Sequence, residues 1–293
     1  MNNLKSSAAK IKLNGFDDLF GGAEIDTFGK ERIMDINLSE LYSFKNHPFK
    51  VPDDEKMEET VESVKQNGVL VPGIARPRIG GGYEIISGHR RKRASELAGL
   101  TSMPCIVRNY QDDEAVIIMV DSNIQRESIL PSEKAKAYKM KFDAMKHQGK
   151  AGAHTIDEIG EKTGESGKTV QRYIWLSRLT DELLDMVDSN KIGIAQAVDL
   201  SFLTEEQQQW ILVILEEQRC SINTDQSLKI KEFGKKDELT LPMIRLILTQ
   251  EKVAKRQVTI KADRISRYFE DSYTTEDIES IIYSLLEQWS KNR

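Results

Sequence analysis

ISGHRRKRASELAGLTSMPCIVR, residues 86–108, contains the end of one strand, a helix and the strand that follows it. The apolar run that begins at Tyr83 ends at Ser87, and Gly88 interrupts it. A polar, mostly basic stretch then opens a helix over residues 89–100, and MPCIVR at 103–108 returns to a strand pattern. A strand, a helix and a strand in close succession predict a small sheet with helices packed on it.

The flanking residues continue this alternation. Residues 53–68 predict a helix that Asp53 or Asp54 caps and that Gly68 ends. A strand pattern follows over 69–78, and the glycines at 80–82 turn the chain into the strand of 83–87. A further helix is expected over 112–127. The pattern therefore predicts a small mixed sheet in this part of the chain.

From Leu130 onward the chain predicts helices only. We expect an α+β protein with a flexible arm at 1–35, a small mixed-sheet domain at 36–128, an all-helical domain at 129–235 and a small C-terminal helical domain at 236–293. An apolar stripe within 274–293 predicts a core helix of that last domain, or alternatively a dimerisation helix.

Composition limits the classes of protein that are possible. The chain has 293 residues, 30% of them charged, and a formal net charge of −5. Any nucleic-acid surface is therefore expected to be a local patch. The two cysteines and four histidines lack metal-ligand spacing, so no zinc site is expected. With no apolar run that could span a bilayer and no secretory signal, we expect a cytoplasmic protein without membrane contact.

A second motif, TGESGKTVQRY at residues 163–173, first suggests the phosphate-binding loop of an ATPase. That loop requires G-x-x-x-x-G-K-[ST] between a buried strand and a helix. Its first glycine would stand at position 162, where this chain has Lys162, and the residues before it are polar with helical spacing. An ATPase loop is therefore not expected here.

The same region predicts two helices around a tight turn. Thr155 is the expected N-cap of the first helix, with Glu158 completing a capping box, and Gly164 lies in the turn. The second helix is expected from Ser166 to Ser177. This is the spacing of a helix-turn-helix motif, with an ordinary helical hairpin as the alternative. The residues expected to reach DNA phosphates or base edges are Ser166, Gly167, Lys168, Thr169, Gln171, Arg172 and Arg178.

Two further expectations concern the same DNA surface. Gly167 is expected to let the backbone approach DNA closely. A basic face on the helix over 131–148 is expected to contact phosphates and to make binding strongly salt-dependent. Its lysines are Lys134, Lys136, Lys139, Lys141 and Lys146.

The helix that starts at His89 predicts an anion site. Backbone N–H groups, the positive end of the helix dipole and the guanidiniums of Arg90, Arg91 and Arg93 together suit a triphosphate. A solvated face or a patch for the DNA backbone would explain the same residues equally well.

The order of three motifs resembles the ParB family of DNA-partition proteins. GHRRKRA at 88–94 is similar to that family's G-[EH]-R-R-x-R-A, and SNIQRE at 122–127 is similar to its E-N-[LI]-Q-R with a following acid. The helix-turn-helix comes after both, and the resemblance covers residues 36–215. It implies a homodimeric, CTP-gated clamp that loads at a palindromic site on duplex DNA, associates with a nucleoid or plasmid, and works with a ParA-type ATPase.

The resemblance also implies site residues. Where the family has two glutamates near Mg²⁺, this chain has His89 and Ser122, so Asn123 remains as the expected Mg²⁺ ligand unless Asp121 substitutes. We therefore expect nucleotide binding without appreciable turnover, and at most slow CTP hydrolysis. The residues that would bind the nucleotide are Gly88, His89, Arg90, Arg91, Val71, Pro72, Asn123, Gln125 and Arg126.

Other classes share parts of this pattern. A sulfiredoxin-like enzyme needs a nucleophilic cysteine where this chain has Gly88, while Cys105 lies on the next strand. In an adenine-nucleotide-dependent small-molecule kinase, the helix-turn-helix would have no function. A ParB-like transcriptional regulator, or a nucleoid-occlusion-type DNA binder without a partition role, would share the same motifs and stays open.

Overall fold

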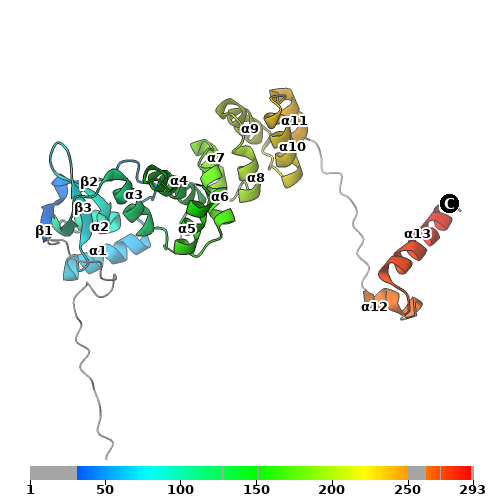
Figure 1. The fold of residues 1–293 in the computed structure, drawn as a ribbon, viewed down its shortest axis with the longest axis horizontal. Helices are drawn as coiled ribbons and strands as arrows, with labels where there is room; N and C mark the ends of the chain where they lie inside the picture. Colours follow the sequence, from blue (N-terminus) through cyan, green and yellow to red (C-terminus); the bar gives the residue numbers. More distant parts are fainter. Residues whose placement is uncertain (1–31, 127–128, 151, 250–261, 271, 292–293) are drawn as a thin grey trace, which may run out of the picture. The chain divides into compact units, whose positions relative to one another are not determined.

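The computed structural model describes residues 32–126, 129–150, 152–249, 262–270 and 272–291 (Figure 1). Almost all of the arm predicted for residues 1–35 lies outside these residues. The chain divides into two units, Met1–Thr249 and Gln250–Arg293. No helix in the described part of the chain is long and apolar enough to cross a bilayer.

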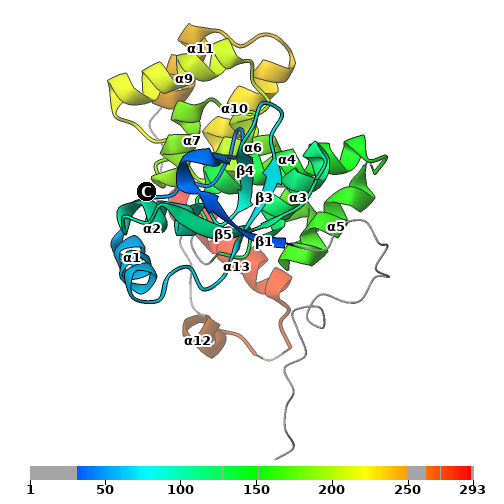
Figure 2. The ribbon, with the colours of Figure 1, turned by 90° about the vertical axis from the view of Figure 1, so that its left-hand side faces the viewer.

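A five-stranded mixed sheet forms the N-terminal part of the first unit (Figure 2). The strand order is β1-β5-β3-β4-β2. β1 and β5 pair antiparallel, as do β3 and β4, whereas β3 with β5 and β2 with β4 are parallel. The predicted mixed sheet is confirmed. The strands are β1 (Arg32–Asn37), β2 (Leu41–Ser43), β3 (Gly73–Pro77), β4 (Tyr83–Ser87) and β5 (Ser102–Val107).

Helices cover both faces of this sheet. Successive side chains of a strand point to opposite faces, so Ile85 and Ile86 of β4 enter two different cores. Ile86 packs with helix α3 (Asp112–Asp121), and helix α2 (His89–Leu97) lies against β3 and β5. Helix α1 (Glu55–Asn67) packs on α2, and it is capped by Asp54 and ended by Gly68, as the sequence predicted.

The rest of the first unit is helical. Its helices are α4 (Pro131–His147), α5 (Ala153–Thr163), α6 (Gly167–Leu176), α7 (Asp181–Asp188), α8 (Ile194–Leu200), α9 (Glu205–Gln218), α10 (Thr224–Lys235) and α11 (Leu241–Thr249). Apolar side chains of α6–α11 form one cluster, which includes Leu239, Ile244 and Leu248. Several residues that follow the predicted domain boundary at 236 therefore pack in the same cluster as the residues before it. The predicted domain boundaries remain predictions.

The second unit contains α12 (Ala262–Ile265), the 3-10 turn η3 (Ser266–Tyr268) and α13 (Thr275–Lys291). Among the described residues, α13 buries none of its side chains. Leu285, Leu286 and Trp289 are all more than half exposed. The core helix expected in this segment is therefore not seen in the described part of the unit.

Candidate functional site

The helix-turn-helix forms where the sequence predicts it. α5 ends at Gly164, whose φ of 72° is a left-handed conformation that glycine adopts without strain. Ser166 is the N-cap of α6, and its hydroxyl accepts a hydrogen bond from the Thr169 N–H (3.2 Å). Gly160 permits the tight turn, because a Cβ there would lie 2.5 Å from the Glu165 carbonyl oxygen.

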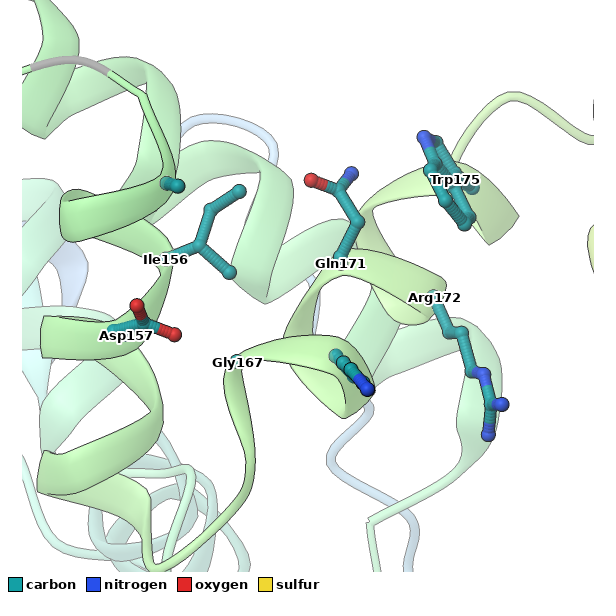
Figure 3. Close-up of a pocket in the computed structure, with 8 residues that line it drawn as sticks. Ile156, Asp157, Gly167, Gln171, Arg172 and Trp175 are labelled. Atoms are coloured by element: carbon teal, nitrogen blue, oxygen red, sulfur yellow. The ribbon is translucent and has the colours of Figure 1, made fainter.

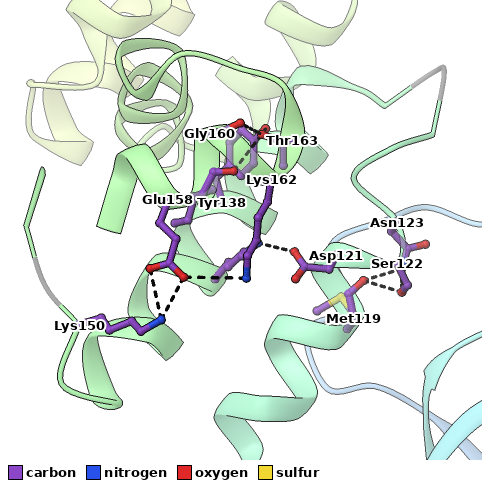
Figure 4. A network of polar contacts seen from close by, with 12 residues as sticks. Met119, Asp121, Ser122, Asn123, Tyr138, Lys150, Glu158, Gly160, Lys162 and Thr163 are labelled. Atoms are coloured by element: carbon purple, nitrogen blue, oxygen red, sulfur yellow. Dashed lines mark hydrogen bonds and ion pairs between the residues drawn. The ribbon is translucent and has the colours of Figure 1, made fainter. Parts of the chain in front are cut away.

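Two local expectations for this motif were wrong. Thr155 is buried inside α5 rather than capping it, and the N-cap is Gly152. Glu158 accordingly makes no capping box and pairs with Lys150 (3.0 Å) (Figure 4). The cause is that the helix starts one turn earlier than its capping pattern suggests, so that Thr155 lies within the helix and its side chain is buried.

An open groove of about 400 Å³ follows the outer side of α5 and α6 (Figure 3). Lys168 and Arg172 are exposed at this groove, and Gln171 lies between Arg172 and Ile156. Asp157 also lines the groove, but no ion pair involves Lys168 or Arg172 within the described residues. The groove therefore presents two cations without an ion pair and one amide on the first two turns of a capped helix.

The other residues predicted to bind DNA take different positions. Ser166 and Thr169 are hydrogen-bonded to each other (2.9 Å) within the cap. Gly167 faces Asp157 of α5, and a Cβ there would collide with that carboxylate, so its smallness serves the contact between the two helices. Arg178 lies beyond the end of α6, against the ring of Phe202.

A polar network holds the turn of the motif onto α4. The Tyr138 hydroxyl lies 3.1 Å from Thr163 Oγ1 and 2.9 Å from Glu165 Oε2 (Figure 4 shows Tyr138 beside Thr163). Lys134 forms an ion pair with the same Glu165. Because Glu165 directly precedes the cap of α6, this network determines where the first turn of α6 is presented.

The predicted basic face of α4 is mostly neutralised in the fold. Lys134 pairs with Glu165, Lys136 with Asp181 (2.7 Å), Lys139 with Asp143, and Lys141 with Asp121. Lys141 is fully buried. The expectation that this whole face contacts phosphates was wrong, because Lys141 is buried and three of the four acidic partners lie on α3, α7 and the turn before α6, where helical spacing along α4 cannot reveal them. The fourth partner, Asp143, lies on α4 itself, four residues after Lys139. Only Lys146 of the five is exposed without an ion pair in the described part of the chain.

The second predicted site lies at the start of α2. Gly88 has a φ of 108° and is the N-cap, so the chain turns directly from β4 into the helix. Arg91 donates hydrogen bonds to the carbonyl oxygens of Val71 (2.6 Å) and Pro72 (2.7 Å). Burial lowers the pKa of Arg91. The structure thus brings Gly88, Arg91, Val71 and Pro72 together, as predicted, with Arg91 fixing the loop before β3.

Beside this helix start is a cleft of about 660 Å³, called here the Arg90–Arg126 cleft. Arg90 is 3.2 Å from Asp54, and burial together with the charge of Arg90 lowers the pKa of Arg126. Two guanidiniums this close repel each other, and an anion placed between them would relieve the repulsion. The full lining is Lys50, Pro52, Asp54, Lys56, Glu59, Thr60, Arg90, Arg126, Ile129, Leu130 and Glu133.

His89 occupies an unusual position within α2. It is 7% exposed and stacks on His47, with 3.7 Å between the ring centroids. Neither ring nitrogen of His89 has a hydrogen-bond partner in the described residues, and His47 Nε2 also lacks one. Burial, and then the neighbouring His47, lower the pKa of His89 to about 3. The pair is therefore neutral near pH 7.

The second motif contributes less to the cleft than the sequence predicts. α3 ends at Asp121, so Asn123 and Gln125 lie in the following turn. Asn123 is 2% exposed and donates to the Met119 carbonyl oxygen (2.7 Å), and Gln125 is exposed away from the cleft lining (Figure 4 shows Asn123). Among the described residues of this motif, 122–126, only Arg126 lines the Arg90–Arg126 cleft.

The residues present do not form a metal site by themselves. No group of three potential ligands among His, Cys, Asp and Glu occurs in the described residues. Asp121 is paired with the buried Lys141, and the Asn123 amide nitrogen donates within its own turn. These hydrogen bonds do not use the Asn123 side-chain oxygen, and its Mg²⁺ role stays a prediction.

Sequence reasoning missed several residues of both sites. Lys50 and Lys56 line the Arg90–Arg126 cleft, and Trp175 lines the α5–α6 groove. Trp175 lies one helical turn after Gln171 and could have been found from that spacing. Lys50 precedes α1 in an irregular segment, where no periodic signal exists. Cys105 is fully buried, and burial raises its pKa to about 11, which makes it a poor nucleophile and counts against sulfiredoxin-like chemistry.

Two solved structures of C-terminally truncated ParB from Caulobacter crescentus are similar to this chain. The one complexed to the centromeric parS site is 22% identical and covers 73% of this chain and 98% of its own, with a TM-score of 0.41. The one complexed with CTP-gamma-S is 25% identical and covers 64% and 98%, with a TM-score of 0.31.

Sequence relatives extend over both the sheet and the helices. The probable chromosome 1-partitioning protein ParB of Deinococcus radiodurans is 28% identical, over 71% of this chain and 68% of that protein. The nucleoid occlusion protein of Listeria innocua is 27% identical, over 81% and 79%. A family model described as the ParB N-terminal domain matches residues 22–124. The chain therefore carries a ParB N-terminal domain at residues 22–124 and is similar to ParB proteins over a longer stretch.

Proposed function

We propose that this protein is a DNA-partition protein that binds duplex DNA through α5 and α6 and binds CTP beside the start of α2. The observation that carries the proposal is the groove along α6, where a capped helix exposes Lys168 and Arg172 without ion-pair partners among the described residues. Basic and amide side chains on the first turns of the second helix are the usual means of contacting phosphates and base edges. The match to the ParB N-terminal domain and the chromosome-partitioning relative add the biological role.

The Arg90–Arg126 cleft supports the nucleotide half of the proposal. Arg90 and Arg126 would hold the phosphates together with the N–H groups at the start of α2, and Lys50 and Lys56 add positive charge. The negative charge of the CTP phosphates would be balanced by the cations that line this cleft. The choice of CTP rather than another nucleotide rests on the resemblance to the ParB family. With Asp121 paired to Lys141 and no other carboxylate beside Asn123 among the described residues, we propose binding without appreciable hydrolysis.

The finer parts of the proposal concern assembly. We infer a homodimer that binds a palindromic site, because two copies of α6 related by a twofold axis match two half-sites. The exposed apolar side chains of α13, among them Leu285 and Leu286, are available for contact between the two copies. A ParA-type ATPase as partner and an association with a nucleoid or plasmid also belong to this proposal.

A nucleoid-occlusion or regulatory role without partition is the second candidate function. The Listeria innocua relative favours it, because its alignment covers a larger share of this chain than that of the Deinococcus partition protein. Both roles use DNA binding and differ in the partner. Binding of a ParA-type ATPase from the same organism to the purified protein would favour partition.

The testing experiment measures two ligands on two variants. Binding of labelled CTP, ATP, GTP and UTP is measured with and without duplex DNA selected by the wild-type protein from a random library. Arg90→Ala should abolish CTP binding and spare initial DNA contact, whereas Arg172→Ala should weaken binding to the selected duplex and spare CTP binding.

Matched controls lie on the same helices or next to them. Arg93→Ala removes a guanidinium of α2 that pairs with Asp53 outside the cleft lining, and Lys162→Ala removes an exposed cation of α5 outside the groove lining. Both controls should bind both ligands like the wild type. If Arg90→Ala and Arg172→Ala each lost both activities equally, two separate sites would be the wrong interpretation.

A further inference from the structure

Three cations converge on one aromatic ring beside the helix-turn-helix. Phe202 follows α8, and its ring centroid lies 4.5 Å from Lys231 Nζ, 5.8 Å from Lys235 Nζ and 5.8 Å from Arg178 Cζ. Arg178 follows α6 and both lysines belong to α10. This set of residues, called here the Phe202 cation cluster, is assembled from three places in the sequence.

The charges of this cluster are only partly balanced within the protein. Lys231 pairs with the largely buried Asp199 at 2.8 Å, and Asp199 also accepts a hydrogen bond from Ser227. Arg178 and Lys235 are exposed and have no carboxylate partner in the described residues. The face of a phenyl ring attracts each cation, but the cations also repel one another. Two net positive charges therefore remain at the surface, where an external anion would stabilise them.

The cluster is continuous with the groove along α6. The rings of Trp175 and Phe202 lie 5.3 Å apart, and Trp175 lines the groove together with Arg172. The backbone between them is firmly held, because the Gln208 amide donates to the Arg178 carbonyl oxygen (3.2 Å) and accepts from the Thr180 N–H (2.9 Å). A ligand that fills the groove and extends past the end of α6 would meet the cluster next.

We propose that the Phe202 cation cluster is a second phosphate-binding surface for duplex DNA, which contacts the backbone beyond the groove that α6 enters. The proposal rests on the DNA-binding function proposed above and extends its contact surface to α10. The cluster lies beyond the end of α6, whose first turns are the part expected to reach base edges, so its contacts go to the DNA backbone. The contact is therefore independent of DNA sequence, in contrast to that of α6.

The test compares two neighbouring lysines. Lys235→Glu reverses the charge of a cluster member, and Lys236→Glu makes the same change at the next residue, which is exposed and is not among the cations on the Phe202 ring. Affinity of the full-length variants is measured by fluorescence anisotropy at several NaCl concentrations. The probes are a duplex selected by the wild type from a random library and an unrelated duplex of equal length, and circular dichroism confirms folding.

Lys235→Glu should weaken binding to both duplexes by the same factor, about tenfold, and lower the slope of log affinity against log salt by about 1. Lys236→Glu should change both quantities much less. Equal effects of the two variants, or a loss confined to the selected duplex, would overturn the second surface while leaving DNA binding by α6 intact. A wild-type protein that binds neither duplex would instead overturn the proposed function itself.

Discussion

The stacked pair of His47 and His89 should make the fold sensitive to mild acid. Burial lowers the pKa of His47 to about 4 and that of His89 to about 3. In the unfolded chain both imidazoles titrate near 6.5. The perturbation is a change of pH from 8 to 5, over which we expect both rings to stay neutral in the folded protein.

The sign and the size follow from proton linkage. Because the folded pKa values are lower than the unfolded ones, the unfolded state binds more protons between pH 6.5 and the folded pKa. The free energy of unfolding therefore decreases as the pH is lowered through this window. At about 1.4 kcal/mol per pH unit below pH 6.5, the 7% exposed His89 should lower the free energy of unfolding by about 2 kcal/mol at pH 5 relative to pH 8. His47 is less buried and should cost less. Above pH 6.5 neither ring contributes.

The assay is an NMR titration of the imidazole protons of the full chain. The His47 and His89 signals should stay in their neutral positions down to about pH 5. Urea unfolding followed at pH 8 and pH 5 then measures the loss of stability, which His89→Gln should reduce. A folded pKa of 6 or above for His89 would refute the reasoning, because it would mean that the ring is hydrated or has an unseen partner.

Two further predictions concern packing around the helix-turn-helix. Gly160→Ala should lower the free energy of unfolding by about 1–3 kcal/mol, because its Cβ would meet the Glu165 carbonyl oxygen at 2.5 Å, whereas the exposed Lys162→Ala should not, as urea unfolding would show. Asp121→Ala should cost about 1–3 kcal/mol, because it removes the partly exposed partner of the fully buried Lys141. Adding Lys141→Met should restore most of that loss, and equal stability of the single and double variants would contradict a stabilising ion pair.

Much of the fold could be predicted because its signals are local. The glycine between an apolar strand and a polar helix start, at Gly88, gave the strand, turn and helix that the structure contains. Ser166 likewise marked the beginning of α6, since a hydroxyl at an N-cap binds an N–H only three residues away. Such interactions depend on neighbouring residues, so the sequence alone contains the information.

The tertiary structure decided which charges are free to act. Lys141 and Lys168 both look like surface cations in the sequence, but folding buries Lys141 against Asp121 and leaves Lys168 at the α5–α6 groove. Likewise, nothing in the sequence joins Phe202 to Lys235. Desolvation and ion pairing depend on residues far away along the chain, so the sequence determined the elements of this protein and only their packing determined its candidate binding surfaces.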